Sequence, residues 1–270
     1  MPADLHVHTT ASDGTESPER VVRLAHALGL DAVGITDHDT VCGVAPAQEA
    51  ARSLDLEVVP GIEINTDYQG REIHILGYYI DPGDAAFRAR IRELAGARAR
   101  RVERIVDRLR SLGLAVTMDD VLRVIGGASP GRPHVAATLV RLGIVGDRQE
   151  AFDRLIGRGC PGYVPREKFS PVEAISLIRR AGGVPVLAHP ATAEADHLIP
   201  ELVQAGLAGL EVYHPEHGAA QVVHYREVAA KFRLLATGGS DFHGYAIHAH
   251  LGEVVVPTEV VAALKLQART

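Results

Sequence analysis

The sequence has few cysteines, no tryptophan and no long hydrophobic run. Only two of its 270 residues are cysteine, Cys42 and Cys160, too few for a disulfide framework; we expect buried thiols in a cytoplasmic protein. The longest apolar runs are strand-sized and contain Asp, His or Gly, so we expect no membrane span and no membrane partner. Residues 1–8 lack a basic stretch followed by an apolar core, so no secretory signal is expected.

The remaining composition is that of a folded globular protein. A hydrophobic content of 46% and a charged content of 23% exclude disordered and fibrous classes. The net charge of -6 argues against a protein that coats a long nucleic-acid polymer. One residue type is in excess, because 14 histidines outnumber the 12 phenylalanines and tyrosines together. A hydrophobic core does not need so many imidazoles, and the histidines therefore direct attention to chemistry.

Short runs of β-branched and apolar residues alternate with segments of helical periodicity. Ser17 and Ser170 each precede a proline, as N-cap residues do at the start of a helix. Strands alternating with helices predict an α/β protein with a mostly parallel sheet, and the number of repeats predicts closure into a barrel. The predicted strands are residues 4–8, 32–37, 57–64, 72–79, 184–189, 209–213, 234–238 and 253–256.

This alternation breaks between residues 85 and 165, where the pattern indicates helices and loops without a strand. We therefore predict a barrel of residues 1–84 and 166–270, interrupted by a helical substrate-binding subdomain of residues 85–165. Within it, residues 86–110 hold nine arginines and three acids, and apolar residues recur at helical spacing. This predicts an amphipathic helix with its basic face outward, which is either simply solvated or steers polyanionic substrates.

Histidines and carboxylates gather where the predicted strands end, and the C-terminal ends of barrel strands carry the chemistry. His6 and His8 are two apart on one strand, so both imidazoles project from the same face and can hold one divalent ion. Ligands of this kind without cysteine favour a multinuclear hydrolytic site over a structural zinc site. The candidate ligands are His6, His8, Asp13, His38, Glu63, His74, His189, Asp241 and His243.

The motifs Asp-Leu-His-x-His, Thr-Asp-His, Gly-Ile-Glu, Ala-His-Pro and Gly-Ser-Asp-x-His, in this order, resemble the PHP (polymerase and histidinol phosphatase) phosphoesterases. The resemblance covers essentially the whole chain. It implies a distorted seven-stranded (β/α)7 barrel with three divalent metal ions, manganese first and iron or zinc as alternatives, and a metal-bridging hydroxide as nucleophile. It implies His6, His8, Glu63 and Asp241 for one metal, Glu63, His74 and His189 for the second, and Asp13, His38 and His243 for the third.

Within the predicted subdomain, Gly131-Arg132-Pro133-His134 and Tyr163-Val164-Pro165, followed by Lys168, resemble a subgroup that contains YciV-like proteins and 3′,5′-nucleoside bisphosphate phosphatases. The resemblance implies a small nucleotide with 3′ and 5′ phosphates, or the 5′ end of a short RNA. The planar guanidinium of Arg132 suits two phosphate oxygens, whereas His134 and Lys168 offer point donors. His214, at the end of a predicted strand, is a candidate proton donor to the leaving oxygen.

Two enzymatic hypotheses follow. The first is a phosphatase that removes the 3′-phosphate from a 3′,5′-bisphosphorylated nucleoside; the second is a 5′→3′ exonuclease on short 5′-phosphorylated oligoribonucleotides. Both place the metals over a phosphoester on the 3′ side of a ribose. A metallo-amidohydrolase also begins with His-x-His but gives no use to Arg132. A non-catalytic PHP module would have lost ligands, and all nine positions hold a suitable residue.

Overall fold

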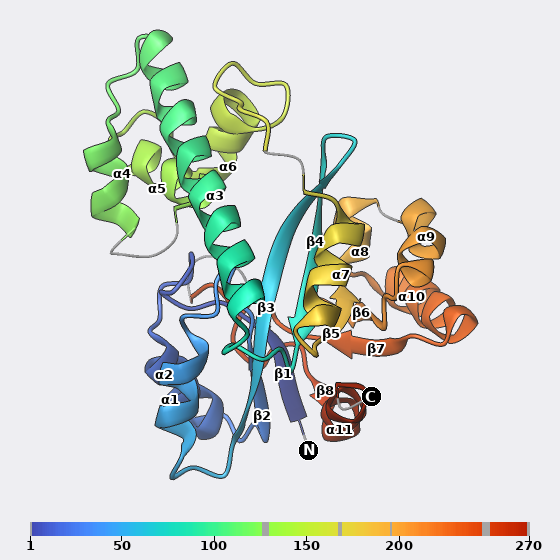
Figure 1. Cartoon of the computed structure of the whole chain (residues 1–270). Coiled ribbons are helices and arrows are strands. Elements are labelled where there is room, and N and C mark those ends of the chain that lie inside the picture. Colours follow the sequence, from blue (N-terminus) through green and yellow to red (C-terminus); the bar gives the residue numbers. More distant parts are fainter. Residues whose placement is uncertain (1, 126–129, 167–168, 195, 245–248, 269–270) are drawn as a thin grey trace.

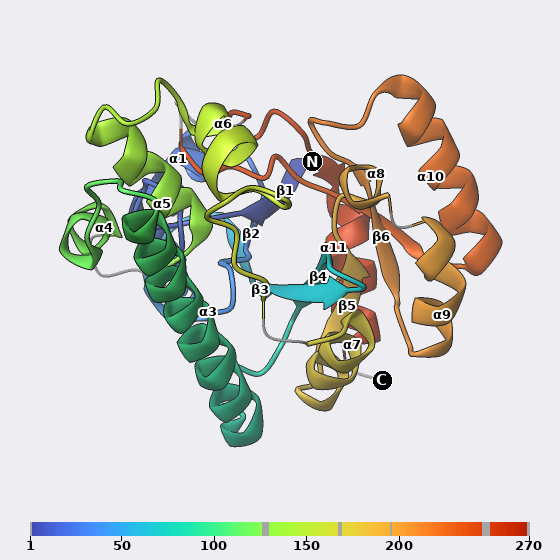
Figure 2. The same cartoon turned by 90° about the horizontal axis from the view of Figure 1, so that it is seen from above.

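The computed structural model describes residues 2–125, 130–166, 169–194, 196–244 and 249–268. Its centre is a sheet of eight strands in the order β7-β6-β5-β4-β3-β2-β1-β8, curled into a nearly closed barrel with helices outside it (Figures 1 and 2). The strands are β1 (Pro2–Val7), β2 (Ala32–Ile35), β3 (Glu57–Tyr68), β4 (Arg71–Tyr78), β5 (Val184–Leu187), β6 (Gly209–Tyr213), β7 (Leu235–Gly238) and β8 (Val256–Pro257). The predicted α/β barrel is confirmed.

The strand directions differ in detail from the prediction, and the strand number differs from that of the resemblance. The described sheet has eight strands, the number that the sequence pattern predicts, whereas the family resemblance implies seven; the two-residue β8 is the eighth and pairs antiparallel with β1. Strands β1 to β3 are parallel, as are β5 to β7, but β4 is antiparallel to both of its neighbours. The cause is a hairpin between β3 and β4, whose turn residues Gln69 and Gly70 have φ of 51° and 78°. A two-residue turn with both φ positive reverses the chain without a crossover helix.

The barrel nearly closes between β1 and the segment after β7. The backbone N–H of His8 donates to the carbonyl of Phe242 at 2.9 Å. The buried Asp4 carboxylate accepts from the backbone N–H of Ser240 at 2.9 Å and from the Ser240 hydroxyl at 2.6 Å. These bonds bring the first and last polar motifs of the chain to the same end of the barrel.

Helices cover both sides of the barrel, α1 and α2 on one and α7, α9 and α10 on the other (Figures 1 and 2). Ser17 and Ser170 accept from the backbone N–H groups of Arg20 and Glu173, as N-caps do. No described helix is long and apolar enough to cross a membrane. These outer helices, with those that complete the C-terminal half, are α1 (Pro18–Ala27), α2 (Val44–Ala51), α7 (Pro171–Arg180), α8 (Pro190–Ala193), η2 (Asp196–Leu198), α9 (Ile199–Gln204), α10 (Ala219–Phe232) and α11 (Thr258–Gln267).

A helical cluster stands over one end of the barrel (Figure 1). The described residues between β4 and α7 form no strand, and the C-terminal half of α3 shares a hydrophobic core with the helices that follow it. Phe87 and Ile91, near the start of α3, pack instead into the core of the barrel. A role of this cluster in substrate binding stays a prediction. Its helices are α3 (Ala85–Ser111), α4 (Met118–Ile125), α5 (Arg132–Arg141), α6 (Arg148–Ala151) and the π-helix η1 (Phe152–Ile156).

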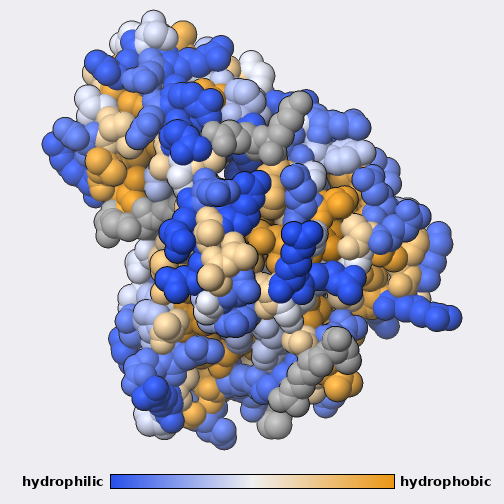
Figure 3. All heavy atoms as spheres, viewed as in Figure 1, coloured by the Kyte–Doolittle hydropathy of each residue, from blue (hydrophilic) through white to orange (hydrophobic). Residues whose placement is uncertain are grey.

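One prediction of exposure holds for most of the residues concerned, and another is wrong. Most arginines of α3 do lie on the outside, and hydrophilic residues predominate on the face of the molecule in Figure 3. Arg98 and Arg101, however, are only 8% and 4% exposed, because their guanidinium groups reach carboxylates and carbonyls beneath the helix. Cys42 is exposed because it lies in the loop before α2, and Cys160 is partly buried, so the expected pair of buried thiols is not found.

Candidate metal centre and phosphate pockets

The structure brings all nine predicted ligands to one end of the barrel. His6 lies on β1 and His8 directly after it, while Glu63 and His74 lie on the paired strands β3 and β4. The remaining five lie in segments that follow strand ends. Residues far apart in the sequence therefore meet because each follows or occupies a strand of the same barrel.

The first predicted ligand group forms a compact set of nitrogen and oxygen atoms. The Nε2 atoms of His6 and His8 lie 3.1 Å apart. Glu63 Oε2 lies 3.4 Å and 3.2 Å from these two atoms, and Asp241 Oδ1 lies 3.3 Å and 3.1 Å from them. The four residues can each offer one ligand atom within 4.8 Å of all the others, a spacing that a single ion can bridge.

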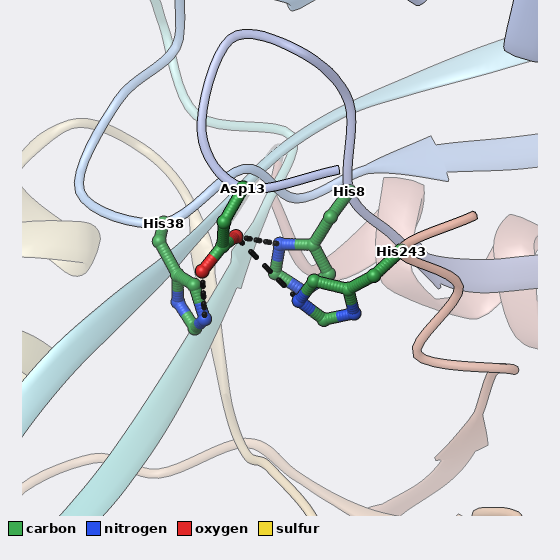
Figure 4. A group of neighbouring side chains, drawn as sticks. All are labelled: His8, Asp13, His38 and His243. Carbon is green, nitrogen blue, oxygen red and sulfur yellow. Dashed lines mark ion pairs between the residues drawn. The ribbon is translucent and has the colours of Figure 1, made fainter. Parts of the chain in front are cut away.

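A second compact set surrounds Asp13. Figure 4 shows its carboxylate between the imidazole rings of His8, His38 and His243. Asp13 Oδ1 lies 3.9 Å from His8 Nδ1 and 3.5 Å from His243 Nε2, and Asp13 Oδ2 lies 3.9 Å from His38 Nε2. The three residues predicted for the third metal are thus together, and His8 joins them through its second nitrogen.

The third set is centred on the other carboxylate oxygen of Glu63. Glu63 Oε1 lies 2.8 Å from His74 Nδ1 and 3.2 Å from His189 Nε2. Glu63 Oε2 lies 2.9 Å from His38 Nδ1, so His38 groups with Glu63 and His74 as well as with Asp13. Glu63 therefore contacts residues of all three predicted groups.

The unpaired atoms of the site fit divalent cations. Buried polar atoms almost always have a hydrogen-bond partner, but His8 Nδ1 and Asp13 Oδ1 are buried here without one among the described residues. Burial opposes ionisation of Glu63, yet the charges of His38, His74 and His6 outweigh it and hold the pKa of Glu63 well below its usual range. An ionised carboxylate among imidazoles is the donor set that divalent transition metals take.

Three of the seven described non-glycine residues with positive φ lie in the same region. His189, Asp241 and Asp39 have φ of 24°, 51° and 52°, in the left-handed region that costs a non-glycine residue roughly 1–3 kcal/mol. Two of these three residues are candidate ligands, and Asp39 Oδ2 accepts from the Asn65 amide at 2.9 Å beside His38. The fold thus holds strained loops where the ligands must point inward.

Glu211 is a site residue that the sequence analysis missed. It is fully buried on β6, and its Oε1 accepts from His6 Nδ1 at 2.9 Å, while its Oε2 accepts from the backbone N–H of His189 at 2.8 Å. A carboxylate in this position fixes the ring orientation of a ligand histidine and directs its other nitrogen at the metal. The only sequence signal was an acidic residue inside an otherwise apolar strand.

A cavity of about 720 Å³ lies over the ligand groups. The barrel contributes most of the candidate ligands to its wall, and the helical cluster contributes Pro133, Val140, Arg148 and Phe152. His214 also lines this cavity: its Nδ1 accepts from the backbone N–H of Glu216, and its Nε2 lies 3.5 Å from Asp241 Oδ2. This position keeps His214 a candidate proton donor.

A smaller cavity of about 100 Å³ adjoins the first and shares Asp13, His38 and His74 with it. Three arginines on its wall converge on Glu72. Arg166 Nη2 lies 2.6 Å and Arg101 Nη1 lies 3.4 Å from Glu72 Oε1, and Arg132 pairs with Oε2. Burial opposes ionisation of Glu72, but the charges of Arg132 and Arg166 hold its pKa well below the usual range. With Arg98, the wall carries four arginines against Asp13 and Glu72, an excess of two positive charges, which suits a phosphate.

The three predicted phosphate-binding residues have different positions. Arg132 lines the small cavity, beside Arg98, Arg101 and Arg166, which the sequence analysis did not single out as anchors. His134 lines neither cavity; its Nδ1 accepts from the backbone N–H of Gly131 at the start of α5, which departs from the expectation. Burial lowers the pKa of His134 to about 4, so it is a neutral cap. Lys168 lies outside the described residues.

A model of the PHP domain matches residues 4–157, more than half of the chain. The chain belongs to the PHP family. Its PHP relatives include a 5′-3′ exoribonuclease of Haemophilus influenzae, 33% identical over 89% of both chains. A phosphoribosyl 1,2-cyclic phosphate 1,2-diphosphodiesterase of Eggerthella lenta is 34% identical over 90% of this chain and 95% of the relative. A 3′,5′-nucleoside bisphosphate phosphatase of Chromobacterium violaceum is 31% identical over 89% of this chain and 86% of the relative.

Solved structures agree with this assignment. A protein from Bifidobacterium adolescentis described as a metal-dependent phosphoesterase has a TM-score of 0.91 and 35% identity, covering 98% of this chain and 96% of its own. A Chromobacterium violaceum structure described as an amidohydrolase with bound sulfate and no metal has a TM-score of 0.88 and 28% identity, with the same coverage. The family, these relatives and the ligand clusters make this PHP protein a metal-dependent phosphoesterase.

Proposed function

We propose that this PHP protein removes the 3′-phosphate from 3′,5′-bisphosphorylated nucleosides and gives a 5′-nucleotide and inorganic phosphate. One observation carries the proposal: the cavity over the metal ligands and the arginine-lined cavity share Asp13, His38 and His74. A phosphoester at the ligands and a second phosphate at the arginines would then belong to one small molecule. The relative named as a 3′,5′-nucleoside bisphosphate phosphatase supports this substrate class.

We infer three divalent ions at the ligand groups, manganese first and iron or zinc as alternatives. When bound, such ions neutralise phosphoryl charge and activate water. The chain's own residues hold the geometry: Glu63 joins the groups, and Glu211 fixes the ring of His6 through a 2.9 Å hydrogen bond. Metal analysis of the reconstituted protein should find three equivalents. Fewer than two would contradict the inferred centre.

The substrate's second phosphate would bind at Arg101, Arg132 and Arg166, whose guanidinium groups make paired, charge-assisted hydrogen bonds to phosphate oxygens. Pro133, Val140 and Phe152 form an apolar wall for the nucleoside in the larger cavity. The Arg132 guanidinium lies 5.5 Å from the centroid of the Phe152 ring, and Phe152 lines both cavities. The phosphate groups and the nucleoside thus have separate binding surfaces.

The reaction breaks the bond between phosphorus and O3′ and forms a bond between phosphorus and a water oxygen, so O3′ must gain a proton. His214 is placed to donate it. Its Nδ1 accepts a backbone hydrogen bond, which places a ring proton on Nε2, and Nε2 lies 3.5 Å from Asp241 Oδ2 at the wall of the larger cavity. His214→Gln should therefore slow leaving-group departure more for nucleotides than for p-nitrophenyl phosphate, whose leaving group needs no proton.

A 5′→3′ exonuclease on short 5′-phosphorylated oligoribonucleotides is the second candidate. The exoribonuclease relative favours it, and a cavity of about 720 Å³ has room for more than one nucleotide unit. The manganese-loaded protein should be given adenosine 3′,5′-bisphosphate and a 5′-phosphorylated RNA pentamer in parallel. We expect faster turnover of the bisphosphate. Turnover of the pentamer about a hundredfold faster, which is about 2.7 kcal/mol in favour of its transition state, would replace the phosphatase by the exonuclease.

A further inference from the structure

A third cavity, of about 360 Å³, adjoins the arginine cluster. Four residues, Glu72, Arg101, Arg132 and Arg166, line both this cavity and the 100 Å³ cavity. None of the nine candidate metal ligands lies on its wall. It is built across two parts of the fold, because Arg71 begins β4 whereas Arg158 follows η1 in the helical cluster. Figure 1 shows the β3–β4 hairpin rising toward this part of the cluster.

The wall of this outer cavity carries five arginines and three acids, an excess of two positive charges among its lining residues. The acids are already engaged. Asp67 Oδ1 accepts from the backbone N–H of Gly70 at 3.0 Å, and Glu194 Oε2 pairs with Arg71 at 2.5 Å. Glu72 is shared by the three arginines common to both cavities. The excess charge therefore has no acidic counterpart on the wall itself.

Arg158 is the arginine that stands out. No carboxylate of the described residues pairs with it, and its guanidinium lies against the hairpin turn. A Cβ added at Gly70 would lie 3.1 Å from Arg158 Nη2. Because glycine has no side chain, the guanidinium can approach the backbone of the turn. A cationic group held at a cavity wall without a partner is what an anion pocket requires.

From this arrangement we propose that the outer cavity binds the β-phosphate of a 5′-diphosphate whose α-phosphate lies at the shared arginines. The enzyme then takes nucleotides whose 5′ end carries a diphosphate. The inference rests on the proposed function, which places the 3′-phosphate at the metal ligands and therefore orients the 5′ end of the substrate toward the arginines. A 5′-phosphate at the shared arginines then has its next phosphate beside Arg158. The preferred substrate class is a 3′-phosphorylated nucleoside 5′-diphosphate.

The direct test compares AMP and ADP as ligands of the manganese-loaded full chain, freed of unbound metal, by equilibrium dialysis. ADP should bind about tenfold more tightly than AMP, the effect of one added charge-assisted contact. Arg158→Gln should bring the two affinities close together. Arg158 is exposed, and a thermal melt checks that the variant is folded. The control Arg110→Gln removes an exposed arginine of α3 that lines none of these cavities and should keep the tenfold preference.

Equal affinities for AMP and ADP in the unaltered protein would overturn the inference, as would an unchanged preference in Arg158→Gln. Inorganic pyrophosphate is measured in the same way, because a free anion could fill the outer cavity alone. Binding of pyrophosphate as tight as that of ADP would overturn the assignment to the nucleotide 5′ end. Release of 3′-phosphate from adenosine 3′-phosphate 5′-diphosphate is followed separately. If neither this compound nor adenosine 3′,5′-bisphosphate releases it, the proposed function fails, and the binding ratio still decides the outer cavity.

Discussion

Single side chains at this site contact several candidate ligands at once, and Glu63 is the clearest example. One of its oxygens lies 2.8 Å from His74 Nδ1 and 3.2 Å from His189 Nε2, while the other lies 2.9 Å from His38 Nδ1. Seven of the nine candidate ligands could be proposed from the sequence because they stand in short motifs, whereas Asp13 and His74 lie outside those motifs. Glu211 and Arg98 could not be predicted, because their roles depend on contacts with residues 205 and 85 positions away.

Asp241→Asn should abolish turnover and leave the fold nearly intact. The change keeps the side-chain volume but removes the charge of an oxygen that lies 3.1 Å from His8 Nε2 and 3.3 Å from His6 Nε2. The loss in kcat should be at least about a hundredfold, since even supporting residues around a metal contribute 10–100-fold. Rates with manganese and circular dichroism measure both effects. If the variant kept more than a tenth of the original kcat, Asp241 would not be a metal ligand.

Glu211→Gln should weaken metal binding without touching a ligand. The neutral amide loses the charge-assisted bond to His6 Nδ1, so the ring is less firmly oriented and less basic. We expect an affinity for manganese lower by about 10–100-fold, measured by titration with a chelator. The control is Glu227→Gln, an exposed acid on α10. If Glu211→Gln and Glu227→Gln bound manganese with equal affinity, Glu211 would not orient His6.

Manganese binding should release protons. Burial opposes protonation of His8, but its hydrogen bonds with Asp241 and Glu63 raise the pKa to about 10 in the metal-free protein. A protonated imidazole cannot hold a metal, so the ion must displace the proton, and the affinity should rise as pH increases toward this pKa. Calorimetric titrations in buffers of different ionisation heats count the protons. Binding enthalpies that do not depend on the buffer at pH 7 would contradict this state of His8.

At the scale of elements, α3 connects the helical cluster to the candidate metal centre. Its amphipathic pattern could be read from the sequence, but two of its arginines lie on the face turned inward. Arg98 Nη2 lies 3.3 Å from Asp13 Oδ2, Arg98 Nη1 lies 3.4 Å from Asp39 Oδ2, and its Nε donates to the carbonyl of Pro130. A charge count along the chain cannot separate such buried pairs from a solvated face, because the pairing carboxylates come from other elements.

Arg98→Met should destabilise the metal-free protein by about 3 kcal/mol, because it removes the guanidinium that pairs with the buried carboxylates of Asp13 and Asp39 and leaves Asp39 only the more distant Arg166, at 3.7 Å, among the described arginines. Bound metal would neutralise Asp13 in its place, so the deficit should shrink in the manganese-loaded protein. Urea unfolding with and without manganese measures both values. Arg110→Met, on the exposed side of α3, should change stability by less than about 0.5 kcal/mol. An equal loss of unfolding free energy with and without manganese would show that Arg98 does not interact with the metal site.

The β3–β4 hairpin is the element whose shape the sequence analysis missed. The two strands were expected, but the predicted first strand ended at Ile64, whereas β3 continues to Tyr68 and pairs with Arg71. The reversal depends on Gln69 and Gly70, both with positive φ, and Gln-Gly is a weak hairpin signal beside Asn-Gly. This turn makes β4 antiparallel and places Arg71, Glu72 and His74 on one strand, which contributes both to the metal ligands and to the outer arginines.

On the scale of the whole molecule, the net charge of -6 conceals an uneven distribution. Acidic ligands and imidazoles gather at the barrel end, and arginines from α3, α5 and the segment before α7 meet beside them. The alternation of strands and helices predicts the barrel class and the order of the strands along the chain. The positions of the motifs predict which end of the barrel holds the candidate site. The meeting of the arginines could not be predicted, because it depends on how the helical cluster packs over the barrel.

The most direct test of the central claim uses Arg132→Ala with two substrates. If the phosphoester lies at the metal ligands and the second phosphate at the arginines, the variant should lose kcat/KM for adenosine 3′,5′-bisphosphate about tenfold more than for p-nitrophenyl phosphate, the worth of a lost charge-assisted contact. The smaller ester has only one phosphate and does not reach the arginine cavity. Equal losses on the two substrates would contradict the account.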